Sequence, residues 1–161
     1  MILIALGANI VSRAGRPAQT LHAAIAEFWR EGISTPAVSP FYETPAWPDP
    51  SDPPFVNAVI RIETSLASAA LLALLQRIEK DFGRVRQMRN APRTLDLDII
   101  DYDGRIEGGP PVLPHPRIES RGFVLIPLRD VAPAWRHPVS GRSVAELIAD
   151  LPQESRSARR L

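Results

Sequence analysis

Two acidic residues within one short apolar segment are the part of the sequence best suited to chemistry. Asp96 and Asp98 lie in Thr94–Ile100, where polar and apolar side chains alternate. In a strand, alternate side chains share a face, so both carboxylates point the same way, about 6.5–7 Å apart. They repel each other by about 2 kcal/mol at an effective dielectric constant of about 20. Mg²⁺ takes one or two carboxylates together with substrate phosphates, so the pair is a candidate magnesium site.

Arginines on both sides of the acidic pair decide how it is interpreted. A solvated acidic strand face would show the same alternation, and for the pair alone that is the better interpretation. The arginines could likewise form a solvated loop paired with acidic residues. Guanidinium groups, however, bind phosphate oxygens, and phosphoryl-type transfer depends mainly on positioning and charge neutralisation. We therefore expect a phosphate-handling site that includes Arg84, Arg86, Arg89, Arg93, Arg117 and Arg121.

Four further residues have an ambiguous pattern when taken alone. His115 could donate to a phosphate or satisfy a turn, and it lacks the His or Cys partners that would indicate zinc. Phe55 and Phe123 are typical of a hydrophobic core. Asn57 is more informative, because strand interiors disfavour Asn and its amide should have a specific polar partner.

Hydrophobic periodicity predicts the elements that position these residues. One helix opens at Pro17 and stops at Gly32, and apolar spacing predicts a second over Ala67–Phe82. Together with the strands, the order β-α-β-β-α-β is the ferredoxin-like pattern of an α+β fold. It predicts a mainly antiparallel sheet with both helices on one face. The strands are expected at Ile2–Leu6, Val38–Tyr42, Phe55–Glu63 and Thr94–Tyr102.

The remaining chain should add loops and C-terminal helices to this core. The proline-rich loop Thr44–Pro54 is long for a plain connection, and long loops in compact domains are often functional. Ser143 is a good N-cap for a last helix through Asp150, and the tail Arg156–Leu161 should be frayed. Short helices are expected at Ile118–Ser120 and Val124–Val131.

Composition limits the class of protein. The 161 residues fit one domain, 1–161, with a substantial core, and there is no Cys for disulfides or thiolate metal sites. The opening apolar run Met1–Leu6 fits a strand better than a signal peptide, so the cytoplasm is the expected location. No apolar window is long enough for a membrane span. Lys80 is the only lysine and precedes Asp81, which excludes a Walker-type phosphate loop.

Several ordered motifs resemble the 6-hydroxymethyl-7,8-dihydropterin pyrophosphokinase family of folate biosynthesis. The central one is Arg89–Ile100, which reads RNAPRTLDLDII. Motifs in the same order as in the family extend from near the start of the chain to about Pro133. They comprise Phe41–Pro45, Phe55–Ala58, Gly83–Arg86, Leu113–Arg117 and Arg121–Leu125. The resemblance implies that ATP donates its terminal pyrophosphoryl group to the hydroxymethyl oxygen of the pterin alcohol, releasing AMP.

The resemblance also implies roles for individual residues. Two Mg²⁺ ions would be held by Asp96 and Asp98, and charge at the reacting phosphates would be neutralised by Arg84 and Arg93. Further phosphate or nucleotide contacts would come from Gln76, Glu79, Arg86, His115 and Arg121. The pterin would be bound by Asn57, by the segment beginning Thr44-Pro45 and by the rings of Phe55 and Phe123. Two loops, Ala46–Pro54 and Arg84–Pro92, would act as mobile lids.

The chain departs from the family pattern mainly in the second lid. Asn90-Ala91-Pro92-Arg93 stands where many members have Trp-Gly-Pro-Arg, so a covering tryptophan is missing, and the loop is about one residue shorter than in some relatives. Pro116 occupies a position that is aromatic in some members. These differences affect lid closure and not the paired carboxylates.

Two other functional classes remain as alternatives. A non-enzymatic ferredoxin-like binding module would not need paired strand carboxylates beside an arginine loop. A nucleic-acid binder or two-metal nuclease could use the arginines, but the net charge is only +1 and exposed aromatics are not interleaved with them. The expected partners are therefore ATP and the pterin alcohol, with no nucleic acid or membrane, and the expected state is a monomer.

Overall fold

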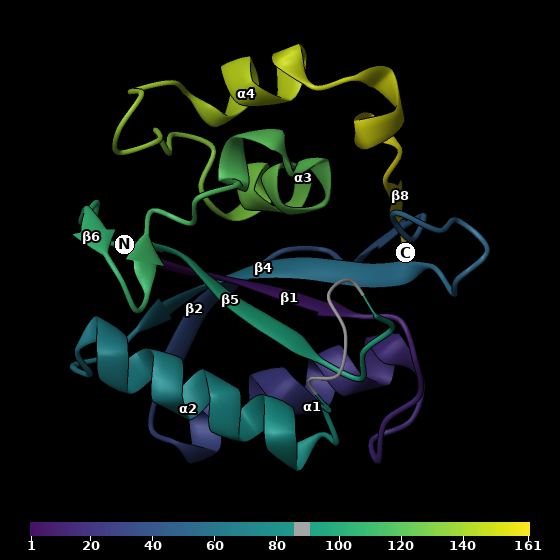
Figure 1. Ribbon diagram of the computed structural model, residues 1–161. Coiled ribbons are helices and arrows are strands. Elements are labelled where there is room, and N and C mark those ends of the chain that lie inside the picture. The colour runs from purple at the N-terminus through teal and green to yellow at the C-terminus, as the bar shows by residue number, and fades with distance from the viewer. Residues whose placement is uncertain (86–90) are drawn as a thin grey trace.

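The computed structural model describes residues 1–85 and 91–161, which form an antiparallel sheet between two helical layers (Figure 1). The strand order is β5-β1-β4-β3-β8, and β2 pairs with another part of β4. Every pairing in this sheet is antiparallel. The strands are β1 (Ile2–Ala8), β2 (Ser34–Val38), β3 (Tyr42–Thr44), β4 (Phe55–Glu63), β5 (Asp96–Tyr102) and β8 (Arg159–Arg160).

Helices cover both faces of the sheet, with α1 and α2 on one side and α3 and α4 on the other (Figure 1). This confirms the ferredoxin-like α+β fold with additional C-terminal helices. Among the described residues, no helix has the length and apolar character needed to cross a bilayer. The helices are α1 (Pro17–Arg30), α2 (Ser68–Asp81), α3 (Gly122–Val131) and α4 (Val144–Asp150), with 3₁₀ turns η1 (Ile118–Ser120) and η2 (Gln153–Arg156) and a small hairpin of β6 (Glu107–Gly108) and β7 (Val112–Leu113).

Alternation along the strands gives each face of the sheet its own hydrophobic core. Along β4, Ile60 and Ile62 pack toward α1 and α2, whereas Val59 packs toward α3 and α4. Full burial of one such side chain contributes roughly 1.5–3 kcal/mol, so both layers are held firmly to one sheet. The larger core also contains Phe28, Leu71, Leu75, Ile78 and Phe82, and the smaller one contains Ile100, Leu125, Leu128, Trp135 and Leu147.

The predicted second strand, Val38–Tyr42, is wrong in its bounds. Pairing with β4 starts earlier, at Ser34, and the segment divides into β2 and β3 around Pro40. Proline has no N–H to donate to the sheet. The Ser39 side chain bridges the interruption instead, because its Oγ accepts the backbone N–H of Val59 at 3.0 Å.

The end of the chain contains one confirmed prediction and one wrong one. Ser143 caps α4 as expected: its Oγ accepts from Glu146 N at 3.2 Å, and Glu146 Oε2 accepts from Ser143 N at 2.7 Å. The tail is not frayed, since Arg159–Arg160 forms β8 against β3. Strand pairing between distant segments leaves no periodic signal in a tail this short.

Candidate active site

The paired aspartates lie on β5, at the edge of the sheet. Asp96 pairs with Gly7 and Asp98 with Ala5 of β1, so the carboxylates are two positions apart on one face. Leu97 and Ile99 point into the core beneath α1 and α2, as predicted. The Asp96 and Asp98 side chains keep 24% and 35% of their surface exposed, which leaves oxygen atoms accessible to a ligand.

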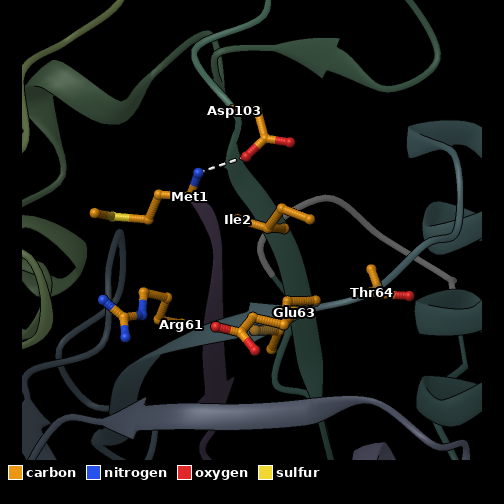
Figure 2. A pocket seen from close by; sticks show the side chains of 7 residues that line it. Met1, Ile2, Arg61, Glu63, Thr64 and Asp103 are labelled. Atoms are coloured by element: carbon orange, nitrogen blue, oxygen red, sulfur yellow. Dashed lines mark hydrogen bonds and ion pairs between the residues drawn. The ribbon is translucent and has the colours of Figure 1, made fainter.

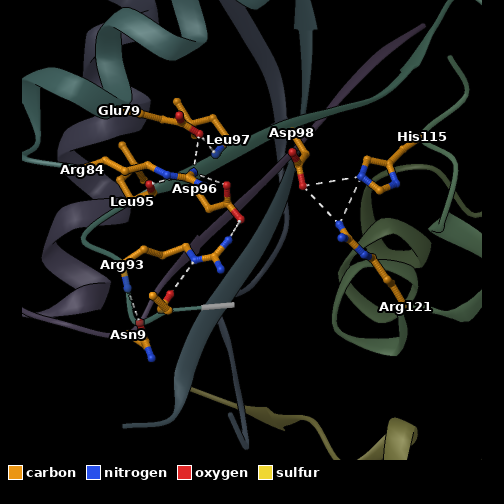
Figure 3. A network of polar contacts seen from close by, with 11 residues as sticks. Asn9, Glu79, Arg84, Arg93, Leu95, Asp96, Leu97, Asp98, His115 and Arg121 are labelled. Carbon is orange, nitrogen blue, oxygen red and sulfur yellow. Dashed lines mark hydrogen bonds and ion pairs between the residues drawn. The ribbon is translucent and has the colours of Figure 1, made fainter. Parts of the chain in front are cut away.

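Two of the predicted arginines meet at Asp96 (Figure 3). Arg84 follows α2 and donates through Nη1 to Asp96 Oδ1 and, at 2.7 Å, to Glu79 Oε1. Arg93 donates through Nη1 to Asp96 Oδ2 at 2.8 Å. One carboxylate thus holds two guanidinium groups that come from opposite ends of the same loop.

Glu79 is the buried support of this cluster. It projects from α2, and its Oε1 accepts the backbone N–H of Leu97 at 2.8 Å as well as the Arg84 guanidinium. Because β5 is an edge strand of the sheet, no other described strand pairs with that N–H on its outer side. Glu79 therefore fixes both the strand and the arginine, whereas Gln76, one turn earlier, is exposed on α2.

The charges in this cluster stabilise one another. Burial would raise the pKa of the Asp96 carboxyl, but Arg84 and Arg93 outweigh it and hold the pKa below its usual value. Burial likewise opposes the charge on Arg84, and Asp96 overcomes this, so the pKa of Arg84 is raised. Asp96 and Arg84 are therefore both ionised at neutral pH.

Asp98 has its own partners, His115 and Arg121, which lie in the segment between β7 and α3 (Figure 3). Arg121 Nη1 donates to Asp98 Oδ2 at 3.1 Å and lies 3.2 Å from His115 Nε2. His115 Nδ1 accepts the backbone N–H of Arg117, so its Nε2 is turned toward Asp98, 3.7 Å from Oδ2. Burial lowers the pKa of His115 despite the nearby Asp98 carboxylate, which keeps the ring neutral at pH 7.

Asn9 is a site residue that the sequence-based prediction did not include. Its Oδ1 accepts from Arg93 N at 2.8 Å, its Nδ2 donates to Pro53 O at 3.1 Å, and its own N donates to Arg93 O at 3.2 Å. Asn9 thus joins the end of β1 to Pro53 of the first predicted lid and to Arg93, directly after the second. Its place after an apolar strand was the available signal, but it is equally typical of an ordinary turn.

A second group of predicted residues lies where β3 and β4 pair. The buried Asn57 amide donates through Nδ2 to Thr44 Oγ1 at 2.8 Å, which supplies the polar partner expected from the sequence. A Cβ at Gly7 would lie only 3.1 Å from Asn57 Oδ1, so glycine keeps this region open. Pro45 follows β3 and is exposed.

Two aromatic rings connect this group to the charged residues. The Arg93 guanidinium lies 5.9 Å from the centre of the Phe55 ring, and that of Arg121 lies 5.6 Å from the Phe123 ring. Phe123 is 40% exposed, which is unusual for a side chain expected in a core. The predicted contacts of Arg86, and the departure at Asn90, lie outside the described residues.

Two open hollows lie away from these residues, and the described residues that line them form no comparable cluster. One, of about 370 Å³, lies at the far end of β1, β4 and β5, where the Met1 ammonium group pairs with Asp103 (Figure 2). The other, of about 550 Å³, lies between the end of α1 and the start of α2. Paired acidic and basic groups mark the β5 edge as the candidate site more strongly than cavity size does.

Fold and site together define an α+β protein of the ferredoxin-like class with a charged site along its edge strand. The sequence description of the 7,8-dihydro-6-hydroxymethylpterin-pyrophosphokinase (HPPK) family matches residues 3–133, and the chain belongs to that family. It is similar to proteins named 2-amino-4-hydroxy-6-hydroxymethyldihydropteridine pyrophosphokinase from several bacteria. That of Synechocystis sp. is 38% identical over 91% of this chain and 73% of the relative. The protein from Pseudomonas aeruginosa is 40% identical over 95% of this chain and 93% of its own length. The protein from Methylorubrum extorquens is 36% identical over 92% of this chain and 91% of its own length.

Proposed function

We propose that the charged site on β5 carries out the reaction of this family. The chain transfers the pyrophosphoryl group of ATP to the hydroxymethyl group of 6-hydroxymethyl-7,8-dihydropterin, a step of folate synthesis. The observation that carries the assignment of the site is the pair Asp96 and Asp98, which share one strand face and are each ion-paired to arginine. In this reaction the hydroxymethyl oxygen bonds to the β-phosphorus, the bond to the α–β bridging oxygen breaks, the hydroxyl proton is released and AMP leaves.

The acidic pair fits Mg²⁺ by the chemistry of its donors. Asp96 and Asp98 offer only carboxylate oxygens, they are partly exposed, and arginines beside them can hold phosphate oxygens. Mg²⁺ takes such carboxylates together with substrate phosphates. Two ions held there would neutralise charge on the triphosphate and make its phosphorus more susceptible to attack.

Arg84 and Arg93 can exchange the Asp96 carboxylate, their present partner, for a phosphate oxygen of the substrate. Arg84 and Arg93 already lie against Asp96, so each has only a short distance to move to a phosphate oxygen. Glu79 keeps hold of Arg84 during this exchange and preserves its orientation, which is the form of preorganisation that stabilises developing charge. Arg121 and the neutral His115 serve the nucleotide, with Arg86 and Gln76 as further contacts.

The acceptor binds where β3 meets β4. Asn57 and Thr44 are joined by a buried hydrogen bond and supply polar groups for the edge of a pterin ring, with Pro45 beside them. Phe55 and Phe123 offer ring faces for stacking, and each is associated with a site arginine. The loop 46–54 closes over the acceptor, and Asn9 joins Pro53 of this loop to Arg93. Residues 86–90 of the second expected lid lie outside the described residues. The protein acts in the cytoplasm as a monomer, without nucleic-acid or membrane partners.

One assay tests the reaction itself. The purified chain is incubated with Mg²⁺, ATP and the pterin alcohol, and the nucleotides are separated by ion-exchange chromatography. AMP should form only when the pterin is present, in equal amount to the pterin diphosphate. Formation of ADP, or no turnover, would reject the proposal.

The metal ligands are tested by isosteric variants. Asp96→Asn and Asp98→Asn should each lower kcat/KM by roughly 100- to 1,000-fold, because a preorganised charge in the site is lost. Asp103→Asn is the matched control: it follows the same strand, lies outside the site, and its positive φ of 53° is tolerated by Asn. The control should stay within about twofold of the parent chain. Binding of Mn²⁺, followed by electron paramagnetic resonance, should weaken in the two site variants only.

A further inference from the structure

The segment 153–161 contacts the start of α3 at a position where only glycine fits. A Cβ at Gly122 would lie 1.8 Å from the carbonyl oxygen of Ser155, in η2. Gly122 stands between Arg121 and Phe123, one proposed for the nucleotide and the other for the pterin. The backbone of this segment is therefore packed directly against the element that presents both side chains.

The same segment also completes the sheet beside the acceptor residues. In β8, Arg159 pairs with Glu43 and Arg160 with Tyr42, and Leu161 N donates to Phe41 O at 2.9 Å. On its other side β3 pairs with β4, where Thr44 stands opposite Phe55. A strand as short as β3 gains much of its order from being paired on both sides.

Both ends of the segment are held by hydrogen bonds, so it connects the α3/α4 layer to the sheet. Arg156 donates to the carbonyl oxygens of Leu151 and Ala149, which ties η2 to the end of α4. Beyond η2 the chain leaves the helical layer and reaches the sheet at β8 (Figure 1). The helical layer carries Phe123 and the sheet carries Thr44, so one segment contacts the supports of both.

We propose that residues 153–161 form a positioning strap for the acceptor pocket, which sets the placement of Thr44 relative to Phe123. This inference rests on the proposed function, because it assigns those two residues to the pterin. The strap touches no substrate. Its effect is on the geometry of the pocket, and hence on affinity for the acceptor more than for ATP.

The test compares the intact chain with a variant lacking residues 158–161. Removing β8 should raise KM for the pterin about tenfold, because misplaced positioning groups lose part of their contact with the acceptor. The KM for ATP and kcat should remain within about twofold. Hydrogen exchange at the amides of residues 42–44 should accelerate in the variant, and this readout does not depend on catalysis.

A matched variant separates strand pairing from charge. The double variant Arg159→Ala, Arg160→Ala keeps the backbone of β8 and removes both side chains, including the Arg159–Glu43 ion pair, whose arginine is 69% exposed. It should keep the pterin KM within about twofold, because exposed ion pairs contribute little. If the double variant shows the same rise in pterin KM as the truncated chain, the effect is due to charge and the proposal is overturned.

The other outcomes are equally decisive. Unchanged exchange in β3, an unchanged pterin KM, or parallel losses of affinity for ATP and pterin would each reject a positioning strap. So would a truncated chain without native circular dichroism, since the segment would then be needed for folding. If the intact chain forms no AMP, the proposed function fails. The hydrogen-exchange measurement on β3 still tests the positioning strap in that case.

Discussion

The charged side chains of the site already hold one another in place before substrate binds. Arg84 is shared between Glu79 and Asp96, and Arg121 lies between Asp98 and His115. Each residue therefore owes its position to its neighbours as well as to its own strand or helix. Replacing one of them should disturb the others, so single substitutions in this network will not act independently.

Asn9 gives a prediction at the level of one residue. Asn9→Ala removes two part-buried side-chain hydrogen bonds and leaves Arg93 N and Pro53 O without these partners. The free energy of unfolding should fall by about 1–3 kcal/mol, measured by urea denaturation. Asn9→Asp keeps the acceptor for Arg93 N and should lose less than Asn9→Ala. A change below about 0.5 kcal/mol for Asn9→Ala would contradict the role described for this residue.

The sequence was sufficient to predict the residues whose position depends on local periodicity. Asp96 and Asp98 share a face because alternation is a property of any strand, and Arg84 and Arg93 were expected beside them from their proximity along the chain. The buried support from Glu79 and Asn9 depends on contacts between distant segments. Such contacts leave no periodic pattern, and Asn9 was missed for that reason.

Among the elements, β3 is held on three sides although it is short. It pairs with β4 and β8, and the Tyr42 hydroxyl donates to Asp130 Oδ2 of α3 at 2.7 Å. The last contact joins the sheet to the helical layer close to Thr44. Strand boundaries here could not be predicted from the sequence, because pairing is decided by distant partners, whereas β4, with its long alternation, was predicted with its exact ends.

The Tyr42 contact predicts a dependence of stability on pH. Burial raises the pKa of the Tyr42 hydroxyl above 10.0, and its bond to Asp130 adds to the effect. A group with a raised pKa stabilises the fold fully below its unfolded pKa, and the contribution is lost as pH rises through the folded value. Between pH 8 and about pH 10.5 the parent chain should lose more of its free energy of unfolding than Tyr42→Phe does. Equal losses in urea denaturation would exclude this explanation.

At the scale of the whole molecule, one sheet serves two hydrophobic cores. Because β1, β4 and β5 contribute side chains to both, neither layer can lose its packing without exposing the other side of the same strands. Residues 1–161 should therefore behave as one domain. Arg121 directly precedes α3, one of the helices that close the second core, so the integrity of this core also matters for the site.

Unfolding should accordingly be a single cooperative transition. Trp135 is buried in the core beneath α3 and α4, whereas Trp29 and Trp47 are exposed, so the fluorescence change reports mainly on that layer. Far-UV circular dichroism reports on the whole chain, and its urea midpoint should coincide with that of fluorescence. Light scattering should give the mass of a monomer, 17.7 kDa. Two separate midpoints would indicate that the layers unfold independently.

The balance of charge in the ion-paired network has a consequence for binding in salt. Within the described part of the chain it contains three carboxylates (Glu79, Asp96, Asp98) and three guanidinium groups (Arg84, Arg93, Arg121). A nucleotide that arrives with two Mg²⁺ ions carries almost no net charge, so its binding exchanges partners among these balanced, described groups. Its Kd should change by less than about twofold between about 0.05 and about 0.5 M ionic strength, whereas that of metal-free ATP should rise steeply. Isothermal titration calorimetry at both ionic strengths would show how the site distinguishes the two forms of the nucleotide. It would do so either by their total charge or by the arrangement of equal and opposite charges in the site.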